Sequence, residues 1–316
     1  ISQVYKAKLK NGADVVVKIE RPNVRAIFET DFILAYCLSA TLNVFGLFKS
    51  ISTKQVVSDF VDWTKRELDF EYEMRNALLF YNHSALYPRT IIPKVYPEYS
   101  TSRVLVMEYI DLPFSADEML RAIEADTNYA LVLKENYDID TKDLAYYFVK
   151  DGLRQFFIDG LFHGDPHPAN LFFLPGGKLG YFDFGIVGEV GQDRLYILRI
   201  LYGISQKDFR FVSKNLMAFS QEAIDREIEI FKKHDTWAFN RYARAILKVE
   251  EILIDEITIE LEEVLASLYQ KKSKTSNASS LLKLLIKAEE HNLYLPQNVA
   301  IFFRSLIIAD MVAVKL

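Results

Sequence analysis

One loop constrains this chain more than any other stretch. The sequence reads His163-Gly164-Asp165-Pro166-His167-Pro168-Ala169-Asn170, and Asp183-Phe184-Gly185 follows it. The two prolines exclude a regular helix and predict a rigid loop. Carboxylate and amide oxygens are ligands that Mg²⁺ prefers, and a further carboxylate kept off the metal can accept a proton. The pattern therefore predicts a site for magnesium-assisted phosphoryl transfer.

The polar residues of this pattern divide into separate roles. Phosphoryl transfer depends on positioning and charge neutralisation more than on covalent chemistry. We expect Asn170 and Asp183 to be the Mg²⁺ ligands and Asp165 to orient or deprotonate the nucleophile. A His/Asp metal cluster of a hydrolase, built on His163 and His167, is the alternative, but the prolines forbid a helical face carrying both histidines. His163 is instead expected to orient the loop from inside, and His167 to lie near the phosphates.

Length and composition narrow the class of protein. The chain has 316 residues, half of them apolar, which is enough for two lobes with separate cores. A net charge of −5 gives no support for a nucleic-acid partner, and we expect none. The one cysteine, Cys37, excludes an intrachain disulfide and is expected to be a buried, inert thiol. Because the sequence begins at Ile1 within a strand-like stretch, it reads as a fragment, and no targeting signal can be judged from it.

The first part of the chain alternates strand and helix patterns. A hairpin is expected from 4–9 and 14–19, around an Asn-Gly turn signal. Helical periodicity covers 23–48 and 54–86, and a second hairpin is expected from 94–99 and 103–110. The uncharged span 32–48 would reach about 25 Å as a helix, short of the ~30 Å membrane core. A helix buried among other helices is therefore favoured there over membrane contact.

The remainder of the chain reads as mainly helical. A helix is expected over 141–159, ending at Gly160, and two short strands over 171–174 and 178–182 flank a Gly-Gly turn. Helices follow from 192 to the end, apart from a polar loop at 271–280. Asp111-Leu112-Pro113 breaks the pattern and marks a lobe boundary. These patterns predict an α+β fold with a small N-lobe over 1–112 and a helical C-lobe over 113–316.

Lys18 stands inside an apolar strand, where a lysine is costly unless it has a partner. Acidic candidates for this partner lie between Glu67 and Glu73, in the helical pattern 54–86, and Glu73 is the first choice. Such a lysine can hold the α- and β-phosphates of a nucleotide. Later, Val104 to Ile110 resembles the strand and hinge that seat adenine through backbone hydrogen bonds, at Met107, Glu108, Tyr109 and Ile110. An ordinary core strand is an equally open interpretation of that run.

Several segments together resemble a known family. They are Ile1 to Ala7, Val17 to Pro22, Glu67 to Phe70, Glu73 to Asn76, His163 to Asn170, Asp183 to Gly185 and the late segment Tyr294 to Arg304. In this combination the chain is similar to the UbiB/ABC1/ADCK family, also called AarF, of atypical protein-kinase-like proteins. The resemblance implies a bilobal protein-kinase-like fold and ATP-dependent activity with ATP and Mg²⁺ as cofactors. It also implies a link to ubiquinone, other isoprenoid quinones or lipids at membranes.

The resemblance assigns further roles, residue by residue. Lys18 and Glu73 would form the N-lobe ion pair, and Asp165 would be the catalytic-loop carboxylate. Asn170 and Asp183 would bind Mg²⁺, and Glu67 and Asp69 match a Glu-x-Asp motif near the nucleotide and metal. Ser2 and Gln3 would be the end of the Ala-rich loop that covers the nucleotide, and Val4 directly after them is also expected to contact the nucleotide. The alanines of that loop would precede Ile1, and Ala169 stands where many members have glycine.

Other parts of the family pattern are missing from this sequence. The N-terminal Lys-x-Gly-Gln extension and the C-terminal membrane helices of some members are absent from this chain. We therefore expect the full-length protein to meet the membrane surface through segments outside this chain. The expected location is the cytoplasmic side of a membrane, or an organelle interior in a eukaryote. A lipid or a quinone precursor is the expected ligand besides ATP.

Sequence positions within and after the predicted catalytic loop narrow the class of phosphotransferase. Gly164 replaces the arginine by which protein kinases dock a phosphorylated activation loop, and no Ala-Pro-Glu follows Asp183-Phe184-Gly185. A peptide-docking platform is therefore not expected. An atypical kinase or ATPase of quinone or lipid metabolism is the leading hypothesis. The alternatives are a small-molecule kinase of the aminoglycoside or choline type and a nucleotide-binding pseudokinase scaffold.

Overall fold

The computed structural model describes residues 2–44, 57, 61, 64–65, 68–111, 115–126, 128–191, 194–218, 220, 250–269, 278–291, 293 and 297–316. The chain forms two compact units. The first comprises residues 1–115, 170–174 and 178–186, and the second comprises 116–169, 175–177 and 187–316. Glu67 and residues 112–114 of the lobe boundary expected near 111–114 lie outside the described residues.

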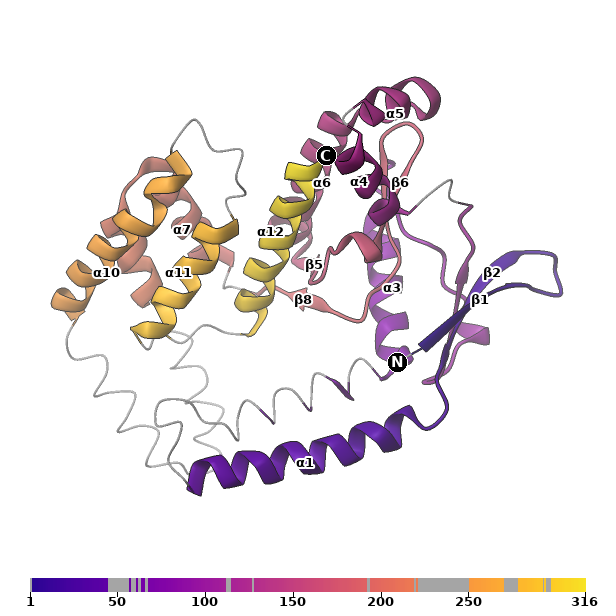
Figure 1. The fold of residues 1–316 in the computed structure, drawn as a ribbon, viewed down its shortest axis with the longest axis horizontal. Coiled ribbons are helices and arrows are strands. Elements are labelled where there is room, and N and C mark those ends of the chain that lie inside the picture. Colours follow the sequence, from indigo (N-terminus) through magenta and orange to yellow (C-terminus); the bar gives the residue numbers. More distant parts are fainter. Residues whose placement is uncertain are drawn as a thin grey trace. The chain divides into compact units, whose positions relative to one another are not determined.

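The first unit opens with an antiparallel sheet. Its strands are β1 (Ser2–Lys8), β2 (Asp14–Glu20) and β4 (Val104–Glu108), in the order β1-β2-β4 (Figure 1). Lys18 lies at the centre of this sheet, opposite Val4 on one side and Leu105 on the other. Val15 and Leu105 are both fully buried, and the register places them on opposite faces of the sheet. The prediction of the first hairpin is confirmed.

A second sheet of the first unit joins distant parts of the sequence. The short strand β3 (Thr90–Ile91) runs parallel to β7 (Lys178–Tyr181), and β7 pairs antiparallel with β6 (Leu171–Leu174). Gly176 and Gly177 take positive φ angles of 76° and 63° in the β6–β7 turn, which explains why glycines stand there. The two predicted strands are confirmed, whereas β3 was not predicted, because two residues carry no periodicity.

The helical pattern predicted over 54–86 is interrupted in the structure. The helix α3 covers Phe70–Ser84, and Asp69 before it is extended, with φ −104° and ψ 97°. Asp69 Oδ1 accepts a hydrogen bond from the amide of Glu71 at 3.0 Å, so it caps the helix. A single helix through this point was therefore the wrong prediction. The capping carboxylate satisfies an amide that would otherwise lack a partner at a new helix start.

The second predicted hairpin has only one of its strands. Pro97–Tyr99 form the 3₁₀ turn η1, with the proline at its start, and Val95 makes an isolated bridge to Met107. β4 instead pairs with β2. Since proline has no amide to donate to a ladder, the first arm cannot continue as a strand past residue 96.

Helix α1 (Val24–Val44) is more exposed than the expected helix buried among other helices. Phe32 and Ser39 are buried, whereas Ile33, Leu34 and Leu38 are each about 60% exposed, and Cys37 is exposed rather than buried. The buried pair is spaced by two helical turns, so α1 buries one stripe only. Residues 45–48 of the expected helix lie outside the described part. Among the residues that the structure describes, no helix is long and apolar enough to cross a bilayer.

The second unit is mainly helical. Its elements are α4 (Ala116–Ala125), α5 (Tyr129–Tyr137), α6 (Thr141–Arg154), the π-helical turn η2 (Gln155–Asp159), β5 (Leu161–His163), β8 (Val187–Glu189), α7 (Arg194–Gln206), α10 (Glu250–Leu265), the 3₁₀ turn η4 (Ala266–Tyr269), α11 (Ala278–Glu290) and α12 (Gln297–Lys315). The 3₁₀ turn η3 (Pro168–Asn170) falls where the chain passes back to the first unit. The predicted helix over 141–159 is confirmed, with its last five residues in π form and Gly160 ending it at φ 71°. The expected polar loop at 271–280 lies mostly outside the described residues, and its last residues begin α11.

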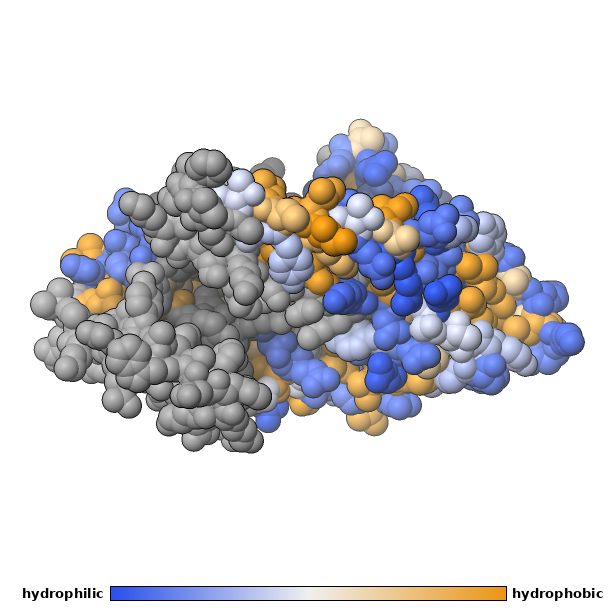
Figure 2. All heavy atoms as spheres, turned by 90° about the horizontal axis from the view of Figure 1, so that it is seen from below, coloured by the Kyte–Doolittle hydropathy of each residue, from blue (hydrophilic) through white to orange (hydrophobic). Residues whose placement is uncertain are grey.

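The core of the second unit forms where η2, β5, α7, α10, α11 and α12 pack together with residues 212–217. Helix α12 also lies beside α6 (Figure 1). The largest members of this core are aromatic side chains, and they include Phe156, Phe162, Phe302 and Phe303. On the molecular face drawn in Figure 2, hydrophilic and hydrophobic residues are interspersed over the coloured part. Apolar side chains exposed singly in this way are ordinary in globular proteins.

Candidate functional site

Lys18 and Glu73 form a buried ion pair within the first unit. Lys18 Nζ lies 2.8 Å from each oxygen of the Glu73 carboxylate. Glu73 stands in the first turn of α3 and is 3% exposed, so Lys18 is its compensating charge. The pairing that the sequence suggested is therefore present. The role of the pair in nucleotide binding stays a prediction.

A third charged group joins this pair. Asp183 Oδ2 lies 3.1 Å from Lys18 Nζ, and the Asp183 side chain is 36% exposed. Lys18 thus connects a buried carboxylate on α3 to a more exposed one after β7. When Glu73 is ionised, two carboxylates against one lysine leave a net negative charge, which suits a cation.

The pKa values of the pair follow from this arrangement. Burial raises the pKa of Glu73 from 4.5 to about 7, and the attraction of Lys18 opposes that rise without cancelling it. For Lys18, burial acts to lower the pKa, but the Glu73 and Asp183 carboxylates outweigh it and raise that pKa above its ordinary value. Lys18 therefore stays charged at neutral pH, whereas the Glu73 carboxyl changes its protonation state near neutral pH.

Asn170 and Asp183 lie at the same end of one hairpin. Asn170 directly precedes β6 and Asp183 follows β7 by two positions, and Leu171 pairs with Tyr181 in the ladder. The amide of Phe182 donates to the Asn170 carbonyl at 3.3 Å, which extends the pairing by one step. Asp183 Oδ1 also accepts from the amide of Gly185 at 3.0 Å, which fixes the orientation of its carboxylate. The hairpin thus brings the two predicted Mg²⁺ ligands together.

The backbone after Asp183 is fixed by helix α3. The Asn76 side chain donates to the carbonyl of Phe184 at 2.9 Å, and this bond is buried. Phe184 is fully buried, and its ring lies 5.1 Å from that of Phe80. Glu73, Asn76 and Phe80 are spaced three and four residues apart, so one face of α3 carries the ion pair and holds the Asp183 segment.

The predicted hinge lies at the end of β4. Met107 is buried opposite Val16, whereas Glu108 is exposed. The amide of Glu108 donates to the Lys94 carbonyl at 2.8 Å. The amide of Tyr109 donates to the Asp14 carbonyl at 3.1 Å. Two of the backbone amides expected to seat adenine are thus already bonded to carbonyls of the protein.

The remaining predicted nucleotide contacts lie on β1 and at the start of α3. Ser2, Gln3 and Val4 form the beginning of β1, where Gln3 and Val4 are exposed. Asp69 acts as the helix cap, a structural role that the sequence interpretation did not foresee. An aspartate followed by two glutamates within four residues is an ordinary helix-start signal and would have indicated that cap. The motif partner Glu67 lies outside the described residues.

The predicted catalytic loop belongs to the second unit up to residue 169. His163 is 3% exposed, and its Nδ1 accepts a hydrogen bond from the amide of Asp165 at 3.1 Å. The acceptor nitrogen carries no proton, so this bond fixes the His163 tautomer. His167 likewise accepts from the amide of Ala169 at 3.1 Å. The buried His163 ring thus orients the loop, as the sequence suggested. Among the described residues, no group of three or more His, Cys, Asp or Glu is suited to a metal.

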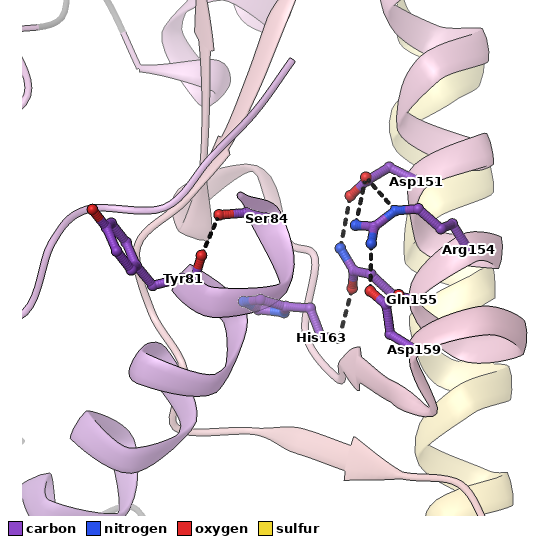
Figure 3. A network of polar contacts seen from close by, with 7 residues as sticks. All are labelled: Tyr81, Ser84, Asp151, Arg154, Gln155, Asp159 and His163. Carbon is purple, nitrogen blue, oxygen red and sulfur yellow. Dashed lines mark hydrogen bonds and ion pairs between the residues drawn. The ribbon is translucent and has the colours of Figure 1, made fainter. Parts of the chain in front are cut away.

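A polar network fixes the backbone of β5 at His163, where the predicted catalytic loop begins (Figure 3). The Gln155 side chain accepts from the amide of His163 at 3.0 Å and donates to Asp151 at 2.7 Å. Arg154 donates to Asp151 at 2.8 Å and also contacts Asp159. Gln155 reaches the loop from the π-helical turn, a conformation that often occurs at functional sites. Sequence reasoning missed this network, because nothing in the local pattern links residue 155 to residue 163.

A sequence model of the ABC1 atypical kinase-like domain matches residues 1–216 of this chain. The chain belongs to the ABC1 family. This family is the UbiB/ADCK/AarF group to which the motifs were compared. The ABC1 domain has an α+β protein-kinase-like fold, so the predicted family and fold class are confirmed.

Curated relatives support the assignment. ACTIVITY OF BC1 COMPLEX KINASE 1, a chloroplastic protein of Arabidopsis thaliana, is 35% identical over 200 residues, which are 63% of this chain and 27% of the relative. The uncharacterized protein Rv0647c of Mycobacterium tuberculosis is 34% identical over 206 residues, 64% of this chain and 39% of the relative. The chain thus spans between about a quarter and two fifths of the length of these relatives.

A solved structure supports the fold. Rv3197 of Mycobacterium tuberculosis, determined in complex with erythromycin, aligns with a TM-score of 0.55 over all of this chain and 71% of its own. Its sequence identity to the ABC1 domain described above is 20%, so the likeness concerns the fold alone.

Proposed function

We propose that this ABC1 domain binds Mg-ATP and acts as an atypical kinase or ATPase in isoprenoid-quinone or lipid metabolism. The observation that carries the proposal is Lys18, whose ammonium contacts the buried Glu73 carboxylate and the more exposed Asp183 carboxylate. A lysine fixed in this way has a defined direction for binding phosphate oxygens. The sequence also carries every polar residue that the proposed reaction requires, which weighs against a pseudokinase scaffold; these residues are Lys18, Glu73, Asp165, Asn170 and Asp183.

Adenine would bind at the end of β4. The amides of Glu108 and Tyr109 donate to carbonyls of the protein. The amide of Ile110, next along the chain, is therefore our proposed donor to the adenine ring, with the Glu108 carbonyl as the acceptor. Gln3 and Val4, exposed on β1, would cover the nucleotide from above.

Asn170 and Asp183 fit a bound Mg²⁺ by the chemistry of their donors. An amide oxygen and a carboxylate at the end of one hairpin match the oxygen ligands that Mg²⁺ takes, together with phosphate oxygens. When bound, the ion neutralises charge that develops on the transferring phosphoryl group. The protein holds Asp183 in place through the Gly185 amide and Lys18.

Asp165 is the proposed proton acceptor. In the proposed phosphoryl transfer, the hydroxyl oxygen of the phosphoryl acceptor forms a bond to the γ-phosphorus of ATP, while the bond from that phosphorus to the β,γ-bridging oxygen breaks. The proton of the acceptor hydroxyl passes to the Asp165 carboxylate, and ADP leaves. The acceptor would be a hydroxyl of a lipid or quinone precursor, or water in the case of an ATPase. The His163 ring and the Gln155 side chain hold the backbone that carries Asp165.

The setting of this activity is proposed from the family. The resemblance to UbiB-type proteins favours quinone or lipid chemistry at a membrane surface. The chloroplastic designation of the Arabidopsis relative supports an organelle interior if the source is eukaryotic. The mycobacterial relative is compatible with the cytoplasmic side of a bacterial membrane.

ATP turnover on liposomes tests the proposal. ADP release is measured for the full-length protein with Mg-ATP, with and without quinone precursors, using Asp165→Ala as the inactive control. We expect release above the control, increased by liposomes or by a precursor. Equal release from wild type and control would contradict catalysis. A phosphorylated amino alcohol or aminoglycoside, found in a parallel substrate screen, would instead support a small-molecule kinase.

A further inference from the structure

The C-terminal helix α12 contacts the predicted catalytic loop directly. Arg304 Nη2 lies 3.5 Å from Asp165 Oδ1, and the Ser305 hydroxyl donates to the His163 carbonyl at 2.8 Å. All four residues belong to the second unit. Helix α12 lies outside the residues 1–216 matched by the family model. The contacts therefore join the loop to a part of the chain that the family match leaves out.

Aromatic packing fixes the position of α12 against the loop. The ring centroid of Phe302 lies 3.6 Å from that of Phe156 and 5.8 Å from that of Phe162, and all three side chains are buried. Phe302 and Ser305 are three residues apart, so they share one face of the helix. This packing fixes the part of α12 that carries Arg304 and Ser305 against the loop.

His163 is then held at both of its backbone groups. Its amide donates to Gln155 on one side, and its carbonyl accepts from Ser305 on the other. Its ring accepts from the amide of Asp165. These bonds fix the backbone of the loop, and Arg304 adds a contact to the Asp165 carboxylate itself.

We propose that Arg304 is a positioning residue that orients the Asp165 carboxylate, with Ser305 fixing the backbone beneath it. The inference rests on the proposed phosphotransfer, in which Asp165 accepts the proton. The guanidinium presents a planar set of donors, so it defines a direction for the carboxylate that a lysine cannot match. A misplacement of a reacting group by about 1 Å can cost on the order of a hundredfold in rate.

Hydrogen exchange of the free full-length protein is the first test, because it does not require turnover. We expect the amides of residues 163–165 to exchange faster in Arg304→Gln and in Ser305→Ala than in the wild type. Lys315→Gln is the matched control, since Lys315 lies on the same helix and loses a comparable exposed ion pair with Glu124. Equal exchange in all four proteins would overturn the proposal.

Turnover is the second test. We expect Arg304→Gln to lower kcat by about tenfold with KM for ATP within about twofold of wild type, and Arg304→Lys to restore part of the loss. Lys315→Gln should keep the wild-type kcat. A kcat for Arg304→Gln equal to that control would overturn the positioning role. If the wild type releases no more ADP than Asp165→Ala, the proposed function fails, and the exchange result decides separately whether α12 holds the loop.

Discussion

Replacing Glu73 by glutamine should change how the stability of the first unit depends on pH. Burial raises the pKa of Glu73 from 4.5 to about 7 in the folded protein, so the folded state binds this proton more tightly than the unfolded chain does. The stability from this proton is fully present below about pH 4.5 and is lost as the pH rises towards about 7. At about 1.4 kcal/mol per pH unit, the difference between the two pKa values corresponds to about 3 kcal/mol.

Glutamine carries no titrating proton, so Glu73→Gln should escape this loss. We expect the unfolding free energy of the variant, relative to wild type, to increase by about 3 kcal/mol between about pH 4.5 and pH 8. The increase is expected even though the variant loses the carboxylate partner of Lys18. Native-state hydrogen exchange of the α3 and β2 amides, corrected for the intrinsic effect of pH, measures it.

Glu71→Gln is the matched control for this prediction. Glu71 is exposed and stands in the same first turn of α3, so both substitutions remove a similar interaction with the helix dipole. The difference between Glu71→Gln and wild type should vary by less than about 0.5 kcal/mol over the same range. A difference for Glu73→Gln that is equally flat, or that falls as the pH rises, would refute the argument that burial dominates at Glu73.

Three further outcomes are expected. The wild-type kcat/KM for ATP should rise as the pH passes about 7, because the Glu73 carboxyl must be ionised to pair with Lys18. A pH–rate profile measures this rise, and Glu73→Gln should lose it. Gln155→Leu should lower the unfolding free energy by about 1–3 kcal/mol, since it leaves buried polar partners unsatisfied; chemical denaturation measures the loss. Gly180→Ala should destabilise the β6–β7 hairpin by about 1–3 kcal/mol or more, because its Cβ would lie 1.9 Å from the Phe172 ring; hydrogen exchange of the strand amides measures it.

The parts of the fold that could be predicted are those with a local signal. The Asn-Gly turn and the alternating apolar residues around it predicted the first hairpin, and the paired glycines predicted the β6–β7 turn. The Lys18–Glu73 contact was also predicted, because a lysine inside an apolar strand needs a charged partner and Glu73 was the first choice among the acidic residues of the helical pattern 54–86.

Local signals were incomplete where a cap or a proline decides the outcome. The periodicity on either side of Asp69 suggested one helix, although the capping carboxylate divides it. The apolar run before Pro97 suggested a strand, although proline cannot continue a ladder. The uncharged stretch in α1 suggested a helix buried among other helices and a buried Cys37, whereas the helix buries a single stripe and Cys37 is exposed.

Contacts between distant positions could not be predicted from one sequence. Ser305 reaches the His163 carbonyl across 142 positions, and Lys18 reaches Asp183 across 165. Such contacts depend on how helices and strands pack, and no local pattern specifies that packing. The sequence therefore indicated which residues carry the chemistry, but not which side chains hold them in place.

Calorimetric titration with Mg-ATP tests the central claim most directly. The account predicts that the wild type binds Mg-ATP, that Asp183→Asn weakens this binding at least tenfold, or about 1.4 kcal/mol, and that the effect disappears when ATP is titrated without Mg²⁺. Asp14→Asn, which changes an exposed aspartate at the edge of the same unit, should bind like the wild type. Equal Mg-ATP affinity in the wild type and Asp183→Asn, or no binding by the wild type, would contradict the account.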